Sequence, residues 1–146
     1  MTLPSLFTPA APTAVVTFEQ MLEKVRHEGA YASTQQAHDA VQRVLEALGR
    51  QLSGDERVEL AARLPKEAAR YLASQIPTGR PLTGWGFVKN LAESTGSSPA
   101  TTRWDTGSVL RVVARLTGDE LVARIIGQLP DGYALLFGRP QLIRAA

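Results

Sequence analysis

The sequence VLEALGRQLSGDE occupies residues 44–56, and the similar sequence VLRVVARLTGDE occupies residues 109–120. Each segment joins an apolar helical pattern to a Ser/Thr-Gly-Asp-Glu turn. Each then continues through a second apolar pattern to a Leu-Pro pair, at Leu64-Pro65 and at Leu129-Pro130. An internal repeat of this kind indicates one helical unit that occurs twice, with the copies packed on each other. We therefore expect an all-α fold, a helical bundle of two pseudo-repeated helical halves.

Apolar side chains recur at helical spacing along most of the chain. Phe18, Met21, Leu22 and Val25 follow the i, i+3, i+4, i+7 rule of an amphipathic helix, which we expect to end at Gly29. Similar stripes fill both repeated segments, and no segment has the period-two alternation of a half-buried strand. The pattern predicts about four helices in each half.

Helix starts are predicted from capping-box spacing, in which a Ser or Thr precedes a Glu or Gln by three residues. The pairs with this spacing are Thr17 and Gln20, Ser33 and Gln36, Ser53 and Glu56, and Thr117 and Glu120. The Ser/Thr-rich residues 97–102 are interpreted as a break between helices. We therefore expect the two Gly-Asp-Glu turns to begin new helices capped by Ser53 and Thr117.

Proline and glycine divide the chain into four parts. Residues 1–16 are punctuated by prolines, which disfavour a helix, and are expected to form an N-terminal arm. Residues 17–76 are the first helical repeat, residues 77–86 are a Pro/Gly-rich connector, and residues 87–146 are the second repeat with a C-terminal tail. Because the chain has 146 residues, we expect the two halves to share one core.

Composition excludes several classes of function. The chain has no cysteine, so disulfides, thiolate metal sites and cysteine nucleophiles are excluded together. The formal net charge is +2, and residues 77–146 carry eight basic and five acidic residues, an excess far below that of a polybasic nucleic-acid arm. The chain has no apolar run long enough to span a membrane and no basic start typical of a secretory signal. We expect a cytoplasmic protein that does not bind membranes.

The repeated segment resembles a known bacterial family. The residues that carry the resemblance are the stretch 44–56, the sequence LAARLP at residues 60–65, and the preceding Phe18, Met21 and Val25. Together they are similar to the family of unknown function DUF2267, over residues 17–75 and more loosely to about residue 137. The resemblance implies a small helical bundle and brings no enzymatic role with it. This chain departs from the family pattern after Leu-Pro, where an aromatic-rich segment is replaced by residues 66–72 and a Pro/Gly loop.

Side chains that could support catalysis are few. His27 and His38 lie in no metal-ligand spacing, and we expect each on a solvated helix face. Glu19, Glu23 and the Asp-Glu pair at 55–56 lie in first turns, where carboxylates favour the helix dipole. Neither Gly-Asp-Glu turn matches a phosphate-binding loop. We therefore expect no catalytic residues, no metal, no organic cofactor and no enzymatic activity.

The function that remains is binding, and the favoured hypothesis is a protein-interaction or structural module. Its candidate partner-binding residues are apolar side chains of the arm and two tryptophans, which often anchor interfaces: Leu3, Leu6, Phe7, Trp85 and Trp104. The partner would be another protein, a larger assembly or a second copy of the chain. The alternative for the arm is that it folds back over the core of its own chain.

Two alternatives are kept. The first is a nucleic-acid-associated regulator that uses the mildly basic second half, with candidate residues Arg103, Arg111, Arg115 and Arg124. Arg111 and Arg115 are four residues apart and share a helix face, but Asp105, Asp119 and Glu120 lie close to them in sequence. The second alternative is a ligand-binding protein or small enzyme with a pocket between the halves.

Overall fold

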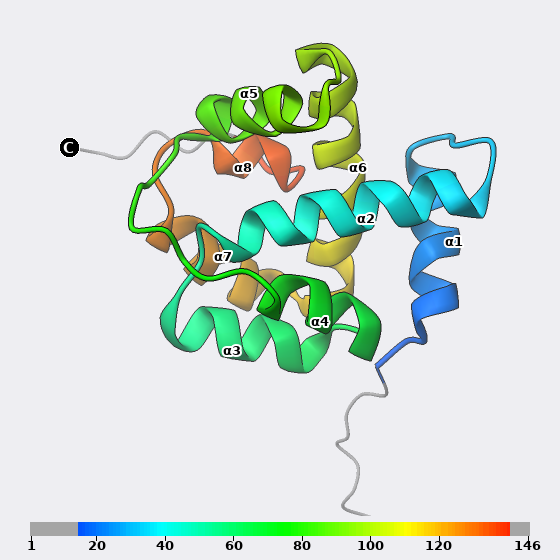
Figure 1. Ribbon diagram of the computed structural model, residues 1–146. Coiled ribbons are helices and arrows are strands. Elements are labelled where there is room, and N and C mark those ends of the chain that lie inside the picture. Colours follow the sequence, from blue (N-terminus) through cyan, green and yellow to red (C-terminus); the bar gives the residue numbers. More distant parts are fainter. Residues whose placement is uncertain (1–14, 141–146) are drawn as a thin grey trace, which may run out of the picture.

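The computed structural model describes residues 15–140, and within that range it contains eight helices and no strand (Figure 1). The helices are α1 (Phe18–Glu28), α2 (Thr34–Gly49), α3 (Gly54–Arg63), α4 (Lys66–Ala73), α5 (Gly84–Thr95), α6 (Pro99–Thr117), α7 (Asp119–Gln128) and α8 (Tyr133–Leu136). The all-α prediction is confirmed. Nowhere in residues 15–140 is a helix both long enough and apolar enough to cross a membrane.

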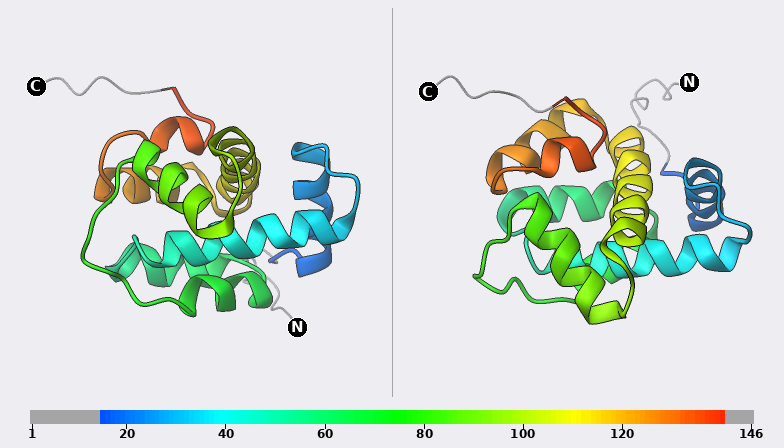
Figure 2. Two further views of the ribbon diagram at one scale, coloured as in Figure 1. Left: turned by 45° about the horizontal axis from the view of Figure 1, so that its top comes forward. Right: turned by 90° about the horizontal axis from the view of Figure 1, so that it is seen from above.

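Two long helices organise the bundle. Helix α2 crosses its middle and contacts α1, α4, α5 and α6. Helix α6 lies with α1 on one side and α5, α7 and α8 on the other (Figure 2). Buried side chains from both halves join a single hydrophobic cluster, in which Leu45 and Leu60 pack with Leu110 and Ile125. The halves therefore share one core.

The repeated Leu-Pro boundary has the same local structure in both copies. Leu64 ends α3 with φ −100° and ψ 156°, and Leu129 ends α7 with φ −91° and ψ 156°. Both side chains are buried. The last helices differ, since α4 has eight residues and α8 has four. An equivalence of the complete halves by superposition stays a prediction.

The helix start at Thr17 follows its local signal. The Gln20 backbone N–H donates to Thr17 Oγ1 over 3.1 Å, and the Thr17 N–H donates to Gln20 Oε1 over 2.9 Å. Both bonds of a capping box are present, so this prediction is confirmed.

The capping boxes predicted at the two Gly-Asp-Glu turns are wrong. The Ser53 side chain makes no capping bond, and its backbone N–H instead donates to Gln128 Oε1 on α7 over 2.9 Å. Thr117 still belongs to α6, where its hydroxyl donates back to the Val113 carbonyl, and Gly118 occupies the N-cap of α7. At Ser53 the Gln128 side chain of α7 takes the place of Glu56, the predicted local partner.

Two predicted boundaries in the second half also move. Helix α5 begins at Gly84, three residues inside the predicted connector 77–86, because Thr83 Oγ1 accepts the Gly86 N–H and caps the helix. The residues interpreted as a break at 97–102 include the first turn of α6, with Ser98 as N-cap. Proline at the first helical position is compatible with this start, because its missing N–H has no partner there.

Candidate functional site

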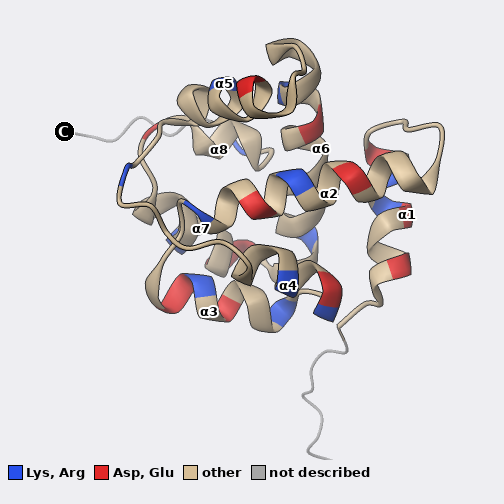
Figure 3. Cartoon of the chain, viewed as in Figure 1, with Lys and Arg blue, Asp and Glu red and all other residues tan. Residues whose placement is uncertain are grey.

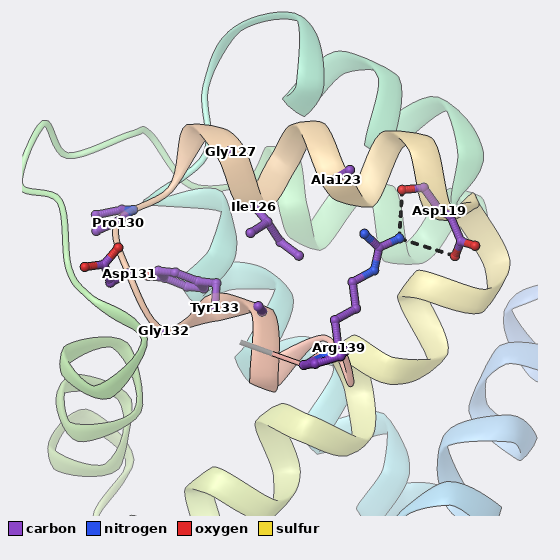
Figure 4. Close-up of a pocket in the computed structure, with 11 residues that line it drawn as sticks. Asp119, Ala123, Ile126, Gly127, Pro130, Asp131, Gly132, Tyr133 and Arg139 are labelled. Carbon is purple, nitrogen blue, oxygen red and sulfur yellow. Dashed lines mark hydrogen bonds and ion pairs between the residues drawn. The ribbon is translucent and has the colours of Figure 1, made fainter. Parts of the chain in front are cut away.

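A cavity of about 580 Å³ lies between α7 and α8, within residues 119–140 (Figure 4). Its lining is mainly apolar. The apolar residues are Ala123 and Ile126 from α7, Pro130 after that helix, Ala134 from α8, and Pro140 after α8. Ala123 is exposed at the surface of α7, whereas Ile126 also packs against the core. The cavity belongs to the second half of the chain and not to the space between the halves.

An ion pair closes one end of this cavity. Nη2 of Arg139 lies 2.8 Å from the Asp119 carbonyl oxygen and 3.3 Å from Asp119 Oδ1. The arginine side chain extends from the segment after α8 toward the first turn of α7 (Figure 4). Asp131 lies at the opposite end, in the turn that precedes α8. Polar groups are therefore confined to the ends of an apolar groove.

Tyr133 forms the inner wall of the groove and is fully buried. Its hydroxyl donates to the Leu82 carbonyl over 2.9 Å, and its ring packs edge-on against Phe87 at 5.7 Å between centroids. Burial raises the pKa of the Tyr133 phenol above its usual range. The hydroxyl joins the connector to α8 through its bond to the Leu82 carbonyl.

Two glycines allow the turn before α8 to touch the start of α5. The Gly84 N–H donates to the Asp131 carbonyl over 2.8 Å, and a Cβ on Gly84 would lie 2.5 Å from the Gly132 carbonyl oxygen. Gly132 itself has φ +102°, which other residues rarely adopt. This backbone contact joins the turn before α8 to the start of α5.

The candidate partner-binding residues do not gather in this groove. Trp85 is the second residue of α5, beside the Gly132 turn, and 63% of its surface is exposed. Trp104, inside α6, is 52% exposed, but its Nε1 donates to the Gly29 carbonyl over 2.9 Å and so joins α6 to the end of α1. Leu3, Leu6 and Phe7 lie outside the described residues.

The four candidate arginines are divided between two places. Arg111 Nε lies 2.8 Å from Glu28 Oε2, and Arg115 Nη2 lies 2.6 Å from Glu28 Oε1. Arg103 is exposed on the same helix, α6. Arg124, on α7, instead bonds to Glu59 of α3, to Glu120 and, at 3.5 Å, to Glu56. In Figure 3 acidic and basic residues alternate along α2 and α3, and no large basic face is seen in that view.

Of the carboxylates considered for acid/base chemistry, Glu23 and Glu56 are held in side-chain bonds, as is the neighbouring Glu59. A hydrogen bond from Arg26 lowers the pKa of Glu23, and a hydrogen bond from Arg124 lowers that of Glu59. Glu56 accepts from Gln128 over 2.9 Å. A general acid needs a raised carboxyl pKa, so these shifts have the opposite sign. Across the described part of the chain, no three His, Asp or Glu side chains are grouped as metal ligands would be.

His38 differs from its expected place on a solvated helix face. Its Nε2 lies 2.7 Å from the Tyr71 hydroxyl and its Nδ1 lies 3.3 Å from Asp39 Oδ1, and only 26% of the side chain is exposed. Phe18 packs edge-on against both rings. The cluster joins α1, α2 and α4. Its partners are 33 positions apart in the sequence, so no local spacing indicates it.

The comparisons with known proteins identify a family. A family model described as "Uncharacterized conserved protein (DUF2267)" matches residues 18–136, which span all of α1 to α8. No curated protein matches the chain. The match therefore identifies a family and carries no activity with it.

Proposed function

The chain belongs to the DUF2267 family, and from the groove between α7 and α8 we propose that it is a non-enzymatic protein-interaction module. The observation that carries this proposal is the apolar lining of the groove, with Arg139 paired to Asp119 at one end and the Tyr133 hydroxyl turned away into the core. Such a site offers contact area and shape, and the side chains of Arg139 and Tyr133 already bond to other groups of this chain.

The partner that we propose is an extended apolar segment supplied by a second copy of this chain. Residues 1–14 contain Leu3, Leu6 and Phe7 spaced among prolines. Fully extended, fourteen residues span about 46 Å, which is enough to reach a neighbouring molecule. Prolines lower the ordering cost of an extended segment, and apolar side chains match the lining of the groove. The module would then assemble through its own arm.

A small-molecule function is the second candidate, and the volume of the groove is the observation that favours it. About 580 Å³ lies within the range of ligand pockets, roughly 300–1,000 Å³. Pockets that fix a small ligand usually add several converging polar groups to an apolar lining. Here the polar side chains lie at the ends and Arg139 is already paired, so the groove suits a polypeptide segment better.

The experiment compares self-association of the full chain with that of two variants, by light scattering coupled to size exclusion over a range of concentrations. One variant lacks residues 2–14, and the other is Ala123→Glu, which places a charge in the groove from an exposed helical position. Ala62→Glu, at an exposed position of α3, is the matched control. We expect association of the full chain and of the control, and its loss in both test variants.

Each result separates the hypotheses. A full chain that stays monomeric at all concentrations would contradict the proposed partner. Association that survives both the deletion and Ala123→Glu would place the interface elsewhere. If instead a small apolar probe raises the melting temperature of the full chain and not of Ala123→Glu, the ligand-binding candidate is supported.

A further inference from the structure

Gly107 lies in the middle of α6, where its backbone is buried. Apart from proline, glycine is the least favourable residue inside a helix, so its presence there calls for a local reason. A Cβ at this position would lie 2.7 Å from Arg103 Nη1 and 2.9 Å from Arg111 Nη1. The space that any other side chain would take is therefore occupied by two guanidinium groups.

These two distances limit the separation of the cations. Both nitrogens lie close to one point, so they are at most 5.6 Å apart, the sum of the two distances. Like charges this close repel each other unless an anion lies near them. Glu28 accepts from Arg111, but within residues 15–140 no carboxylate forms an ion pair with Arg103. The pair therefore carries positive charge that its carboxylate does not fully neutralise.

The surroundings hold Arg111 in place. The Gly138 backbone, with φ +82°, comes so close to the Arg111 stem that a Cβ there would lie 2.8 Å from Arg111 Cγ. Glu28 accepts a hydrogen bond from Arg111 Nε and so orients that side chain. Asp105, which lies between the two arginines in the sequence, accepts a hydrogen bond from the Tyr31 hydroxyl over 2.6 Å. Arg111 is thus fixed from two sides, while Arg103 is exposed at the surface.

We propose that Arg103 and Arg111 bind a phosphate-type oxyanion above Gly107. Charge-assisted hydrogen bonds of about 2.8 Å from two nitrogens no more than 5.6 Å apart can meet on a single oxyanion. Arg115 also pairs with Glu28, so this carboxylate is shared between Arg111 and Arg115 and leaves Arg103 without an ion pair among the described residues. This site uses α6 and is separate from the groove of α7 and α8. Failure of one proposal therefore does not contradict the other.

The test titrates the full chain with inorganic phosphate and, in parallel, with phenyl phosphate, and follows backbone amide shifts by NMR at low ionic strength. We expect saturable binding with shifts at residues 103–111. Arg103→Ala should weaken it about tenfold or more, as loss of a charge-assisted hydrogen bond does. Arg70→Ala, an exposed arginine of α4, is the control and should bind as the unaltered chain does.

Two further variants separate a binding site from a structural role. Gly107→Ala should weaken phosphate binding while the melting temperature stays equal or rises, because alanine favours the helix and its Cβ displaces only the terminal Nη1 atoms of Arg103 and Arg111. Glu28→Gln should strengthen binding, since it removes the carboxylate that competes for Arg111, even though it removes a contact between helices.

The two probes distinguish the source of the anion. Equal affinity for both indicates free phosphate, and preference for phenyl phosphate indicates a phosphate ester. The proposal is overturned if neither probe saturates, or if Gly107→Ala and Arg103→Ala bind phosphate as tightly as the unaltered chain. It is also overturned if only duplex DNA binds, with a steep salt dependence that Arg103→Ala removes, because the contact would then be to a nucleic-acid backbone.

Discussion

The carboxylate of Glu28 accepts a hydrogen bond from Arg111 Nε over 2.8 Å and so joins the last turn of α1 to α6, 83 positions away in the sequence. A glutamate at the C-terminal end of a helix faces the negative end of the helix dipole, which disfavours it. Arg111, helped by Arg115, offsets that cost. The position of α1 on the bundle therefore depends partly on one carboxylate.

This pair predicts a loss of stability in acid. Hydrogen bonds from Arg111 and Arg115 lower the pKa of Glu28 from its ordinary 4.5. Because the folded-state pKa is lowered, the contribution of Glu28 is complete above pH 4.5 and is lost as pH falls through the lower value. Glu28→Gln should cost about 1 kcal/mol at neutral pH, and the difference should shrink near pH 3. Urea unfolding at both pH values measures it; an equal difference at both would contradict the prediction.

Substitution of Arg57 should lower the stability of the fold more than substitution at most other partly exposed positions. Its guanidinium donates to the carbonyls of Gly49 and Leu52 at and just after the end of α2. It also donates to those of Leu72, at 3.1 Å in the last turn of α4, and Gln75, at 2.5 Å just after that helix. These are helix-end carbonyls that no intrahelical N–H reaches. Arg57→Met should cost about 2 kcal/mol, and Arg57→Lys should recover only part, because one ammonium cannot reach both helix ends. Chemical denaturation of the three proteins provides the comparison, and full recovery by lysine would refute the four-carbonyl account.

Gly84 should tolerate no side chain. An alanine Cβ would lie 2.5 Å from the Gly132 carbonyl oxygen. The nearest atoms all belong to the Gly132 backbone, which cannot rotate away as a side chain would. Gly84→Ala should therefore cost about 1–3 kcal/mol, as overpacking does. The matched control is Gly127→Ala in α7, where a Cβ meets nothing within 4 Å and a gain of about 0.5–1 kcal/mol is expected. Melting temperatures that move in the same direction would show the contact to be unimportant.

The internal repeat predicts that Leu64 and Leu129 are equivalent. Replacing either with alanine should cost about 2–5 kcal/mol, because each is buried at the end of its helix. Equilibrium unfolding of both variants tests the energetic part. Superposing residues 17–75 on residues 87–137 tests the structural part, and a superposition that leaves the two leucines apart would rule out the duplication.

Local patterns were sufficient for the elements whose bonds close within a few residues. The stripe from Phe18 to Val25 predicts α1, and Thr17 and Gln20 cap it as their spacing requires. The all-α class and the family also follow from such patterns, because helical periodicity and caps depend on neighbours in the chain. The start of α6 was missed because Ser98 and Pro99, read as a break, form a helix start instead.

The groove could not be predicted from the same patterns. Ala123 and Ile126 have the spacing of core residues, but they line an open space beside the turn at Gly132, which meets Gly84. That meeting joins residues 48 positions apart, which no periodicity describes. This groove lies within the second half of the chain. A separate cavity of about 520 Å³ lies between α1 and α6, one helix from each half, and is lined by Glu28, Val112 and Arg115, so the expected pocket between the halves is not contradicted.

What the sequence by itself determined was the helical class and the residues available for burial, since these depend on side-chain type and short-range spacing. Only the tertiary structure decided which polar and charged side chains come together. Gln128 displaces the local cap at Ser53, Glu28 reaches Arg111, and Arg103 is left beside Arg111 above Gly107. Such pairings depend on distances in space, and a long side chain bonds to whichever partner the packed helices bring within about 3 Å.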